Sequence, residues 1–251
     1  MCKLFDLTGK IAIVTGASTG LGQGMSIGLA EAGANLVLVD YVEMNETEKI
    51  ISDLGRDCIS LKLDLMNKES IGIIVKETMN KFGTIDILVN NAGIIRRAPA
   101  IEFTEKDWDD VMYLNSKVVF FLSQAVAKIM IQNKRGKIIN IASMLSFQGG
   151  IIVPSYSASK GAVAQITKAL ANEWAQYGIN VNAIAPGYMA TNNTANLRKD
   201  PVRFKSISER IPAGRWGLPE DLKGPVVFLA SSASDYVNGH ILAVDGGWLA
   251  R

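Results

Sequence analysis

The amino-acid sequence predicts a single α/β domain, in which helices cover both faces of a doubly wound parallel sheet of seven strands. Short, β-branched apolar runs alternate with longer helical patterns along all 251 residues, as in chains built from right-handed βαβ units. Several of these runs are apolar at every position, as expected for parallel strands that are buried on both faces. No Pro-, Gly- or Ser-rich linker and no repeat divides the chain, so we expect one domain over residues 1–251.

The expected strands and helices follow one another along the chain. Strands are predicted at residues 11–15, 36–40, 58–64, 86–90, 137–142, 180–185 and 241–245. Helices are predicted between them, at residues 21–32, 42–54, 68–82, 105–132, 155–177 and 220–230. The most apolar stretch, residues 118–131, is interrupted by Ser123, Gln124 and Lys128. It is therefore too polar to span a bilayer, and a buried helix is expected there.

One segment, residues 189–212, lies outside this alternation. It begins with small polar residues and continues as a mixed amphipathic pattern. A long, weakly regular insertion late in an α/β domain is often a lid over the substrate. We therefore expect a substrate lid here, with a pair of solvent-exposed surface helices as the alternative.

Charge and composition exclude several classes of protein. The chain has 26 basic and 24 acidic residues, a net charge of +2, so neither nucleic acid nor an anionic membrane is an expected partner. Cys2 and Cys58 are not in a ligand spacing, and His240 is the single histidine. These residues predict reduced thiols, no metal site and no Ser-His-Asp triad. The first ten residues lack an apolar stretch of signal-peptide length, so a cytoplasmic protein is expected.

A glycine-rich loop follows the first expected strand. Glycines there let the backbone turn tightly and approach a pyrophosphate, while free amides at the start of the next helix hold its negative charge. The position after the first strand of a βαβ unit is the context that such a loop requires; a tight turn without a ligand is the alternative. The residues expected to line a dinucleotide cofactor here are Gly16, Ser18, Thr19, Gly20, Leu21 and Gly22.

The residue at the end of the second expected strand predicts which dinucleotide binds. Asp40 stands there, 18 residues after Gly22. A carboxylate at this position accepts hydrogen bonds from both hydroxyls of the adenosine ribose and repels a 2′-phosphate. Thr19 and Tyr41 offer no guanidinium to neutralise such a phosphate. NAD is therefore expected rather than NADP.

Three further polar residues suit hydride-transfer chemistry. Ser143 follows the fifth expected strand, and Tyr156 and Lys160 share one face of the next helix through their i, i+4 spacing. A free phenol, with a pKa of about 10, needs help to act as a base near neutral pH. Lys160 would favour the phenolate electrostatically and can bond the nicotinamide ribose, and Ser143 can donate a hydrogen bond to the substrate's carbonyl oxygen. We expect Tyr156 to be the general acid/base; a core tyrosine, a surface lysine and a turn serine are the alternatives.

Together, these motifs resemble the short-chain dehydrogenase/reductase family over essentially the whole chain. After Thr15 the glycine spacing is Gly-x-x-x-Gly-x-Gly, not the Gly-x-Gly-x-x-Gly of other dinucleotide folds, and Ser143 precedes a Tyr-x-x-x-Lys pair. The resemblance implies a Rossmann-type enzyme that interconverts a hydroxyl and a ketone with a nicotinamide cofactor.

The resemblance also assigns roles to further residues. It implies that Asp64 and Leu65 contact the adenine ring, although as a bare observation Asp64 can equally be a helix cap. It implies that Asn115 holds a water that links Lys160 to solvent as a proton relay. Met189 departs from the branched aliphatic residue that is usual at its position. The remaining implied cofactor contacts are Asn91, Ala92, Gly93, Pro186, Gly187, Met189 and Thr191.

Five stretches, residues 90–97, 142–150, 186–194, 210–217 and 243–251, resemble the sugar-acid branch of this family. This implies a small sugar-acid substrate and a homotetramer. Arg96 and Arg97 begin the loop beyond the nicotinamide end of the sheet, where a guanidinium fork suits a carboxylate. We favour Arg97 slightly; two solvated arginines that bridge a neighbouring helix or subunit are the alternative. The other residues expected at the sugar chain are Ser143, Met144, Ser146, Gln148 and Asn193.

The sequence leaves other functions open. A gluconate 5-dehydrogenase shares the branch, and a 3-oxoacyl-carrier-protein reductase shares the fold. Asp40 and the even charge disfavour the NADPH and the basic carrier surface that such a reductase needs. A catalytically silent NAD-sensing protein is an alternative of another class. Because such proteins commonly lose a catalytic residue, the presence of Ser143, Tyr156 and Lys160 disfavours it.

Overall fold

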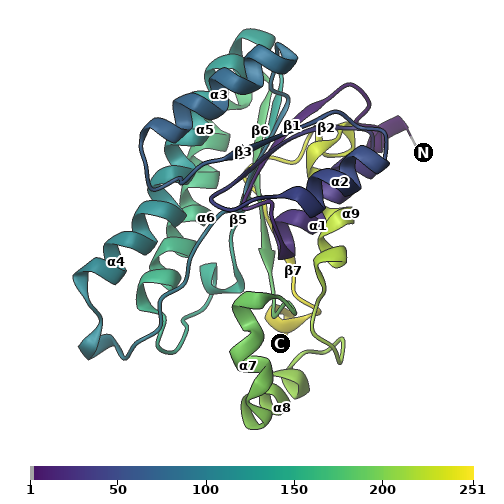
Figure 1. Cartoon of the computed structure of the whole chain (residues 1–251). Helices are drawn as coiled ribbons and strands as arrows, with labels where there is room; N and C mark the ends of the chain where they lie inside the picture. Colours follow the sequence, from purple (N-terminus) through teal and green to yellow (C-terminus); the bar gives the residue numbers. More distant parts are fainter. Residues whose placement is uncertain (1–2) are drawn as a thin grey trace.

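A computed structural model describes residues 3–251 of the chain (Figure 1). The thiol expected at Cys2 lies outside the described residues, whereas Cys58 is a free cysteine. All seven expected strands form, with end points within two residues of the expected ones. They are β1 (Ile11–Thr15), β2 (Asn35–Asp40), β3 (Cys58–Lys62), β4 (Ile87–Asn90), β5 (Gly136–Ile141), β6 (Ile179–Pro186) and β7 (Ile241–Val244). They make one sheet in the order β3-β2-β1-β4-β5-β6-β7, so the expected doubly wound fold is confirmed.

The winding of the sheet reverses at β1. This strand pairs in parallel with β2 on one side and with β4 on the other. Ligands of doubly wound sheets bind in the crevice beyond the carboxyl ends of the strands at such a switch point. The glycine loop after β1 and the loop after β4 therefore share the edge where a dinucleotide is expected.

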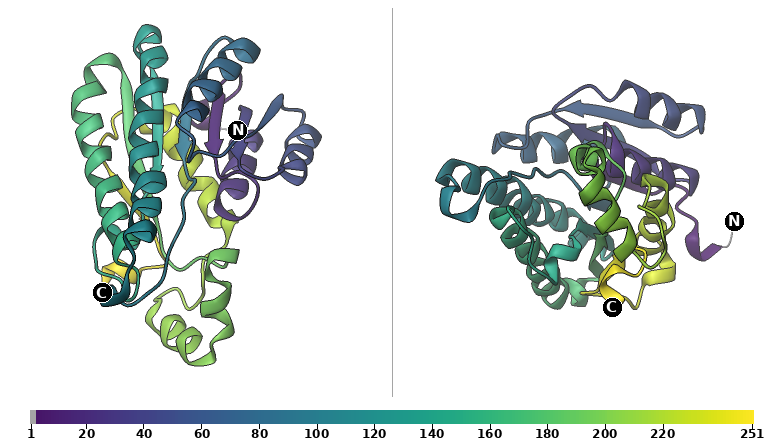
Figure 2. Two further views of the ribbon diagram at one scale, coloured as in Figure 1. Left: turned by 60° about the vertical axis from the view of Figure 1, so that its left-hand side comes forward. Right: turned by 90° about the horizontal axis from the view of Figure 1, so that it is seen from below.

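Helices cover both faces of the sheet (Figures 1 and 2). One face carries α1 (Gly20–Glu31), α2 (Asn45–Asp53) and α9 (Lys223–Ala230), and the other carries α3 (Glu69–Phe82), α5 (Val118–Asn133) and α6 (Pro154–Trp174). Alternate residues of β1 supply the two cores: Ala12 and Val14 pack on the first face, Ile11 and Ile13 on the second. This period of two, with both sides buried, explains why the strands read as continuous apolar runs.

The prediction of one long helix at residues 105–132 is wrong in one respect, because the helix is not α-helical throughout. It consists of α4 (Glu105–Met112), a π-helical turn (Tyr113–Lys117) and α5. By length and apolar composition the whole segment Glu105–Asn133 could cross a membrane, but half of its apolar window is buried inside the protein. Leu122, Val126 and Met130 of α5 are fully buried in the core, as expected for a buried helix.

The segment at residues 189–212 contains α7 (Ala195–Lys199) and α8 (Pro201–Arg210), which project beyond the carboxyl ends of the strands (Figures 1 and 2). The two stretches of chain that lead into and out of this segment, which we call its stems, are hydrogen-bonded to each other. The Ala190 amide donates to the Gly217 carbonyl at 2.7 Å, and the Gly217 amide donates to the Tyr188 carbonyl at 3.0 Å. Both alternatives for this segment, a lid and a pair of surface helices, fit this geometry. We retain the lid as a proposal.

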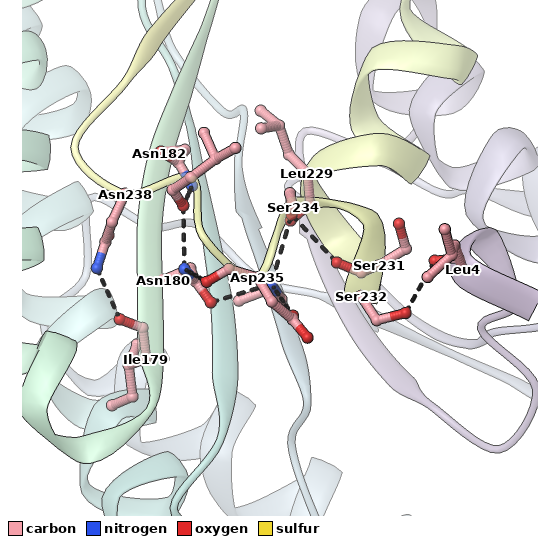
Figure 3. A network of polar contacts seen from close by, with 12 residues as sticks. Leu4, Ile179, Asn180, Asn182, Leu229, Ser231, Ser232, Ser234, Asp235 and Asn238 are labelled. Atoms are coloured by element: carbon pink, nitrogen blue, oxygen red, sulfur yellow. Dashed lines mark hydrogen bonds and ion pairs between the residues drawn. The ribbon is translucent and has the colours of Figure 1, made fainter.

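At the other end of the sheet, where the strands begin, polar side chains form hydrogen bonds between the loop before β7 and the start of β6 (Figure 3). Asn180 donates to the main-chain oxygen of Asp235 at 3.0 Å, and Asn238 donates to that of Ile179 at 3.3 Å. Ser232 donates to the oxygen of Leu4 at 3.1 Å, which ties down the N-terminal segment. This network gives hydrogen-bond partners to polar groups at the amino ends of the last two strands.

Candidate cofactor and substrate site

The glycine loop has the shape of a phosphate cradle. Gly16 and Gly20 have φ of +67° and +60°, which side-chain-bearing residues rarely adopt. A Cβ at Gly22 would collide with the carbonyl oxygen of Gly16, so only glycine fits there. Thr19 is the N-cap of α1 but makes no side-chain cap bond. The first amides of this 12-residue helix are thus left to a ligand, which fits the diphosphate of a dinucleotide.

The loops after β1 and β4 are bonded to each other. The Asn91 side-chain amide donates to the carbonyl oxygens of Thr15 and Gly16 at 2.8 and 3.0 Å. The Asn91 and Ala92 amides both donate to the Thr15 hydroxyl at 3.0 Å. Two of the residues expected at the cofactor therefore fix the path of the backbone at the switch point. Gly93 continues this loop, where a Cβ would meet Asn115 Oδ1 at 3.0 Å.

Asp40 ends β2 beside the glycine loop, as expected. The side chain is 7% exposed. Oδ2 accepts the Ser18 amide at 3.0 Å, and Oδ1 accepts the Tyr41 amide at 2.8 Å. Because a carboxylate has about four lone-pair sites, it can accept ribose hydroxyls as well. Its place against Ser18 puts it at the rim of the phosphate cradle.

The other residues that were expected to contact the cofactor differ in burial and in position. Asp64 is exposed and accepts the Met66 amide at 2.8 Å within its own turn. It is not the helix cap of the alternative interpretation, because the N-cap of α3 is Lys68; Leu65 is buried against the core. After β6, Thr191 lies across from the glycine loop, since a Cβ at Gly20 would meet its methyl group at 3.6 Å. Met189 is buried.

Ser143 and Tyr156 are brought together at the ends of β5 and α6. Ser143 caps a short turn, Met144–Ser146, where its hydroxyl accepts the Leu145 amide at 3.1 Å. Tyr156 lies in the first turn of α6, where the nearby Ser143 side chain lowers the pKa of its phenol. Lys160 follows one turn later, with Nζ 5.6 Å from the centre of the Tyr156 ring. The expected triad is therefore assembled.

Burial dominates the acid–base behaviour of this triad. It raises the pKa of Tyr156, whereas the Ser143 hydroxyl and the positive charge of Arg97 lower it. Burial also lowers the pKa of Lys160 to about 8. The ammonium of Lys160 donates to the carbonyl oxygen of Ile141. This bond holds the charge of Lys160 5.6 Å from the centre of the Tyr156 ring, and the expected electrostatic stabilisation of the phenolate by Lys160 stays a prediction.

Asn115 lies in the π-helical turn and is buried, with 1% of its surface exposed. Its Oδ1 accepts the Ile94 amide at 2.9 Å, and its Nδ2 donates to the Ile94 carbonyl at 2.9 Å and to the Ser159 hydroxyl at 3.1 Å. Both N–H donors of the side chain are thus used in joining the loop after β4 to α6, while Oδ1 keeps a second lone pair. The water relay expected at Asn115 stays a prediction.

The two arginines of the loop after β4 have different partners. Arg96 Nε lies 3.4 Å from Asp107 Oδ1 in α4, and both side chains are more than a third exposed. Arg97 instead donates to the main-chain oxygen of Asn193 at 3.2 Å, at the start of the projecting segment, and its charge acts on Tyr156. Of the two arginines, Arg97 is therefore the one whose positive charge lowers the pKa of Tyr156.

The remaining expected substrate residues divide into two groups. Met144 is 6% exposed and packs in an apolar cluster with Ile207, Ile211, Trp216 and Trp248. Ser146 donates to the Lys160 carbonyl oxygen at 2.7 Å. The side chains of Met144 and Ser146 are therefore occupied by contacts within the protein. Gln148 and Asn193 keep partly or fully exposed side chains near the site.

Sequence reasoning missed three residues that support the site. Thr47 in α2 donates to the Ala17 carbonyl oxygen at 3.0 Å and so braces the glycine loop. Ser159, between Tyr156 and Lys160, donates to the Tyr156 carbonyl oxygen at 2.8 Å. Trp248, near the C-terminus, donates to Gln148 Oε1 at 3.2 Å. The contacts of Thr47 and Trp248 span 30 and 100 positions of sequence, which no local pattern predicts. The contact of Ser159 lies within one helical turn, and the Tyr-x-x-Ser order alone does not show which residue the serine bonds.

Comparison with known proteins places the chain among sugar-acid oxidoreductases. Residues 16–249 match the family described as "Enoyl-(Acyl carrier protein) reductase". The chain is 64% identical over 248 residues to a 2-dehydro-3-deoxy-D-gluconate 5-dehydrogenase of Dickeya dadantii, covering 98% of each protein.

Solved structures agree in fold over nearly the full length. A protein of Agrobacterium tumefaciens with bound NADP, proposed to be a 2-deoxy-D-gluconate 3-dehydrogenase, is 55% identical with a TM-score of 0.90 over 99% of each chain. A gluconate 5-dehydrogenase of Burkholderia cenocepacia, in complex with NADP and tartrate, is 41% identical with a TM-score of 0.94, over 99% of this chain and 98% of that one.

Proposed function

Because the chain belongs to the short-chain dehydrogenase/reductase family and is an oxidoreductase acting on a CH–OH group, we propose that it interconverts 2-dehydro-3-deoxy-D-gluconate and its 2,5-diketo form with NAD(H). This reaction belongs to the catabolism of uronic acids. Support comes from the 64% identity to the Dickeya dadantii enzyme. The observation that carries the proposal is the convergence of Ser143, Tyr156 and Arg97, which combines a proton donor with a fixed positive charge.

The proton transfer is assigned to Tyr156. When bound, a nicotinamide cofactor supplies the acceptor or donor of the hydride. In reduction, the Tyr156 hydroxyl gives its proton to the ketone oxygen; in oxidation, the Tyr156 oxygen takes the proton of the substrate hydroxyl. Ser143 donates a hydrogen bond to the same substrate oxygen. Because burial raises the pKa of Tyr156, the phenol stays protonated near neutral pH, which is the state that protonates a ketone.

Arg97 is proposed to bind the carboxylate of the sugar acid. Its guanidinium offers a planar fork of donors that matches a carboxylate. Its hydrogen bond to the Asn193 main-chain oxygen places it between the reactive tyrosine and the projecting segment. A carboxylate bound by Arg97 would hold the ketone of the same small acid near Tyr156, since the charge of Arg97 acts on that phenol. Arg96, paired with Asp107, is less available for this role.

The cofactor is proposed to be NAD. Asp40 lies against Ser18 with no arginine or lysine bonded to it, so a 2′-phosphate there would meet an uncompensated carboxylate. Lys160 is proposed to bond the nicotinamide ribose on leaving the Ile141 oxygen. The related structures of Agrobacterium tumefaciens and Burkholderia cenocepacia hold NADP, so the ratio of kcat/KM with NAD(H) to that with NADP(H) tests this assignment.

The remaining features follow from the same assignment. We propose one catalytic domain with residues 189–212 as its substrate lid, a homotetramer as in the family, and a cytoplasmic location. A gluconate 5-dehydrogenase is the second candidate, because one related structure carries that name and binds tartrate, a small hydroxy acid.

A panel of keto sugar acids with NADH tests the proposal, with the loss of NADH absorbance as the readout. We expect the highest kcat/KM for the 2,5-diketo form of 2-dehydro-3-deoxygluconate. Fastest reduction of 5-keto-gluconate would favour the second candidate. Equal reduction of neutral ketoses would overturn the assignment of a carboxylate site.

A further inference from the structure

The C-terminal segment holds one indole rigidly at the base of the projecting helices. After β7, Gly246 and Gly247 turn the chain with φ of +65° and +90°. Asp245 fixes the turn, since its two carboxylate oxygens accept the amides of Gly247 and Leu249, each at 2.9 Å. The turn leads into a short 3-10 helix (Trp248–Ala250) in which Trp248 is 4% exposed.

Trp248 contacts three segments of the chain: the stem after β6, the end of α8 and the loop that follows Ser143. Its ring meets Tyr188, in the stem after β6, edge-on at 4.8 Å between centroids. The guanidinium of Arg210, at the end of α8, lies 3.9 Å from the centre of the ring, within the range of a cation–π contact. Its Nε1 donates to Gln148 Oε1 at 3.2 Å. One side chain thus touches the lid, its stem and the loop after β5.

The hydrogen bond from Trp248 has a chemical consequence for Gln148. An amide side chain has an acceptor oxygen and a donor NH₂ group, and an indole N–H can only donate. The contact therefore occupies the oxygen and leaves the two N–H donors of Gln148 for another partner. Gln148 lines an open cavity of about 510 Å³ together with Trp248, Phe147 and Arg251. An amide held in this way presents donors, which suit the carboxylate, keto and hydroxyl oxygens of a sugar acid.

We propose that Trp248 is a positioning residue for the substrate: it fixes the Gln148 amide with its NH₂ group toward the sugar acid and links that amide to lid helix α8 through Arg210. This inference deepens the proposed function and rests on it both for the identity of the acid and for the place of Gln148 beside that acid. Trp216 provides a matched comparison, because it packs in the same apolar cluster but donates its Nε1–H to Ser208 of α8 at 3.0 Å.

The test compares Trp248→Phe with Trp216→Phe, using whichever keto acid the parent protein reduces best. Phenylalanine keeps the ring and removes the indole N–H, so Trp248→Phe should raise KM for the acid by about 3- to 10-fold, as for the loss of one hydrogen bond. Its kcat and its Kd for NADH should stay within about 2-fold of the parent, because the reacting groups are untouched. Trp216→Phe should leave KM for the acid unchanged.

A double-mutant cycle separates positioning from packing. If Trp248 acts through Gln148, adding Trp248→Phe to Gln148→Ala should raise KM no further. Parent-like KM in Trp248→Phe, an equal effect in Trp216→Phe, or additive effects in the double variant would each overturn the inference. If the parent prefers a compound other than the deoxy keto acid, the proposed substrate is wrong, while the comparison of the two tryptophans still decides the role of Trp248.

Discussion

The guanidinium of Arg97 donates a hydrogen bond to the main-chain oxygen of Asn193 at 3.2 Å. This contact joins the loop after β4 to the first residues of the projecting segment, across 96 positions of sequence. A main-chain oxygen is a weaker partner for a guanidinium than a carboxylate is. An incoming acid can therefore take over the donors of Arg97 at the point where the projecting segment, the proposed lid, begins.

Replacing Arg97 with alanine should raise KM for the keto acid by about 10-fold or more, in line with the loss of a charge-assisted hydrogen bond of about 1.5–3 kcal/mol. The Kd for NADH should barely change, because no contact of Arg97 reaches the glycine loop. Steady-state kinetics over a range of acid concentrations give the KM, and fluorescence titration gives the Kd.

Arg96→Ala is the control for this prediction, since its guanidinium is paired with Asp107 on the surface. Its KM should stay close to that of the parent. A larger effect in Arg96→Ala than in Arg97→Ala would reassign the carboxylate site to Arg96. If both variants keep the KM of the parent, neither arginine of this loop binds the carboxylate.

Tyr156→Phe should abolish turnover while leaving NADH binding nearly intact. The ring still packs at the start of α6, but the transferable proton is gone. Tyr177→Phe, at the far end of the same helical segment, should retain full activity. Activity above a tenth of the parent in purified Tyr156→Phe would exclude the tyrosine as the acid/base.

The affinity for NADH should depend on pH through Lys160. Burial lowers the pKa of this lysine to about 8 in the cofactor-free chain. If its ammonium donates to the nicotinamide ribose, the complex favours the protonated form, and the pKa of Lys160 rises on binding. By linkage, affinity is then constant below pH 8 and falls above it, by at most about 10-fold per pH unit for one proton.

Lys160→Met is the variant that isolates this effect. Its Kd for NADH should be higher than that of the parent at pH 7 and should not change between pH 7 and pH 9.5. Tyr156 and Cys58 do not interfere, because burial raises the pKa of both. A parent protein whose Kd stays flat up to pH 9.5 would show that Lys160 makes no ammonium bond to the cofactor.

The strands and the glycine loop could be predicted from the sequence because their signals are local. Buried parallel strands require apolar residues on both sides, and Gly22 is required by a backbone contact six residues away. The π-helical turn around Asn115 was missed because apolar periodicity continues through it. That turn is fixed by bonds from Asn115 to Ile94 and Ser159, which are distant in sequence.

The choice of partners for polar side chains could not be predicted in the same way. Arg96 and Arg97 are adjacent in sequence, yet one bonds α4 and the other reaches the projecting segment. Ser146 and Gln148 lie in one short loop, yet Ser146 bonds the backbone of α6 and Gln148 accepts from the C-terminal Trp248. Such differences depend on tertiary packing rather than on residue type.

The choice of cofactor gives the last prediction. In the parent, kcat/KM with NAD(H) should exceed that with NADP(H) by about 10²-fold or more, because a 2′-phosphate would be desolvated against the Asp40 carboxylate. That carboxylate is 7% exposed and holds the Ser18 amide, so it cannot swing away without giving up a buried hydrogen bond. Asp40→Ala should narrow the preference, mainly by improving KM for NADP(H).

Glu43→Ala supplies the control for charge alone. Glu43 lies three residues beyond Asp40, is 64% exposed and pairs with Lys62 at 2.8 Å, so its removal changes the net charge equally without touching the cradle. It should leave the preference for NAD(H) as it is. Equal efficiency of the parent with both cofactors, as the NADP in related structures would suggest, would instead mean that Asp40 moves aside on binding. In that case Asp40→Ala would leave the ratio unchanged, because the carboxylate would contribute nothing to discrimination.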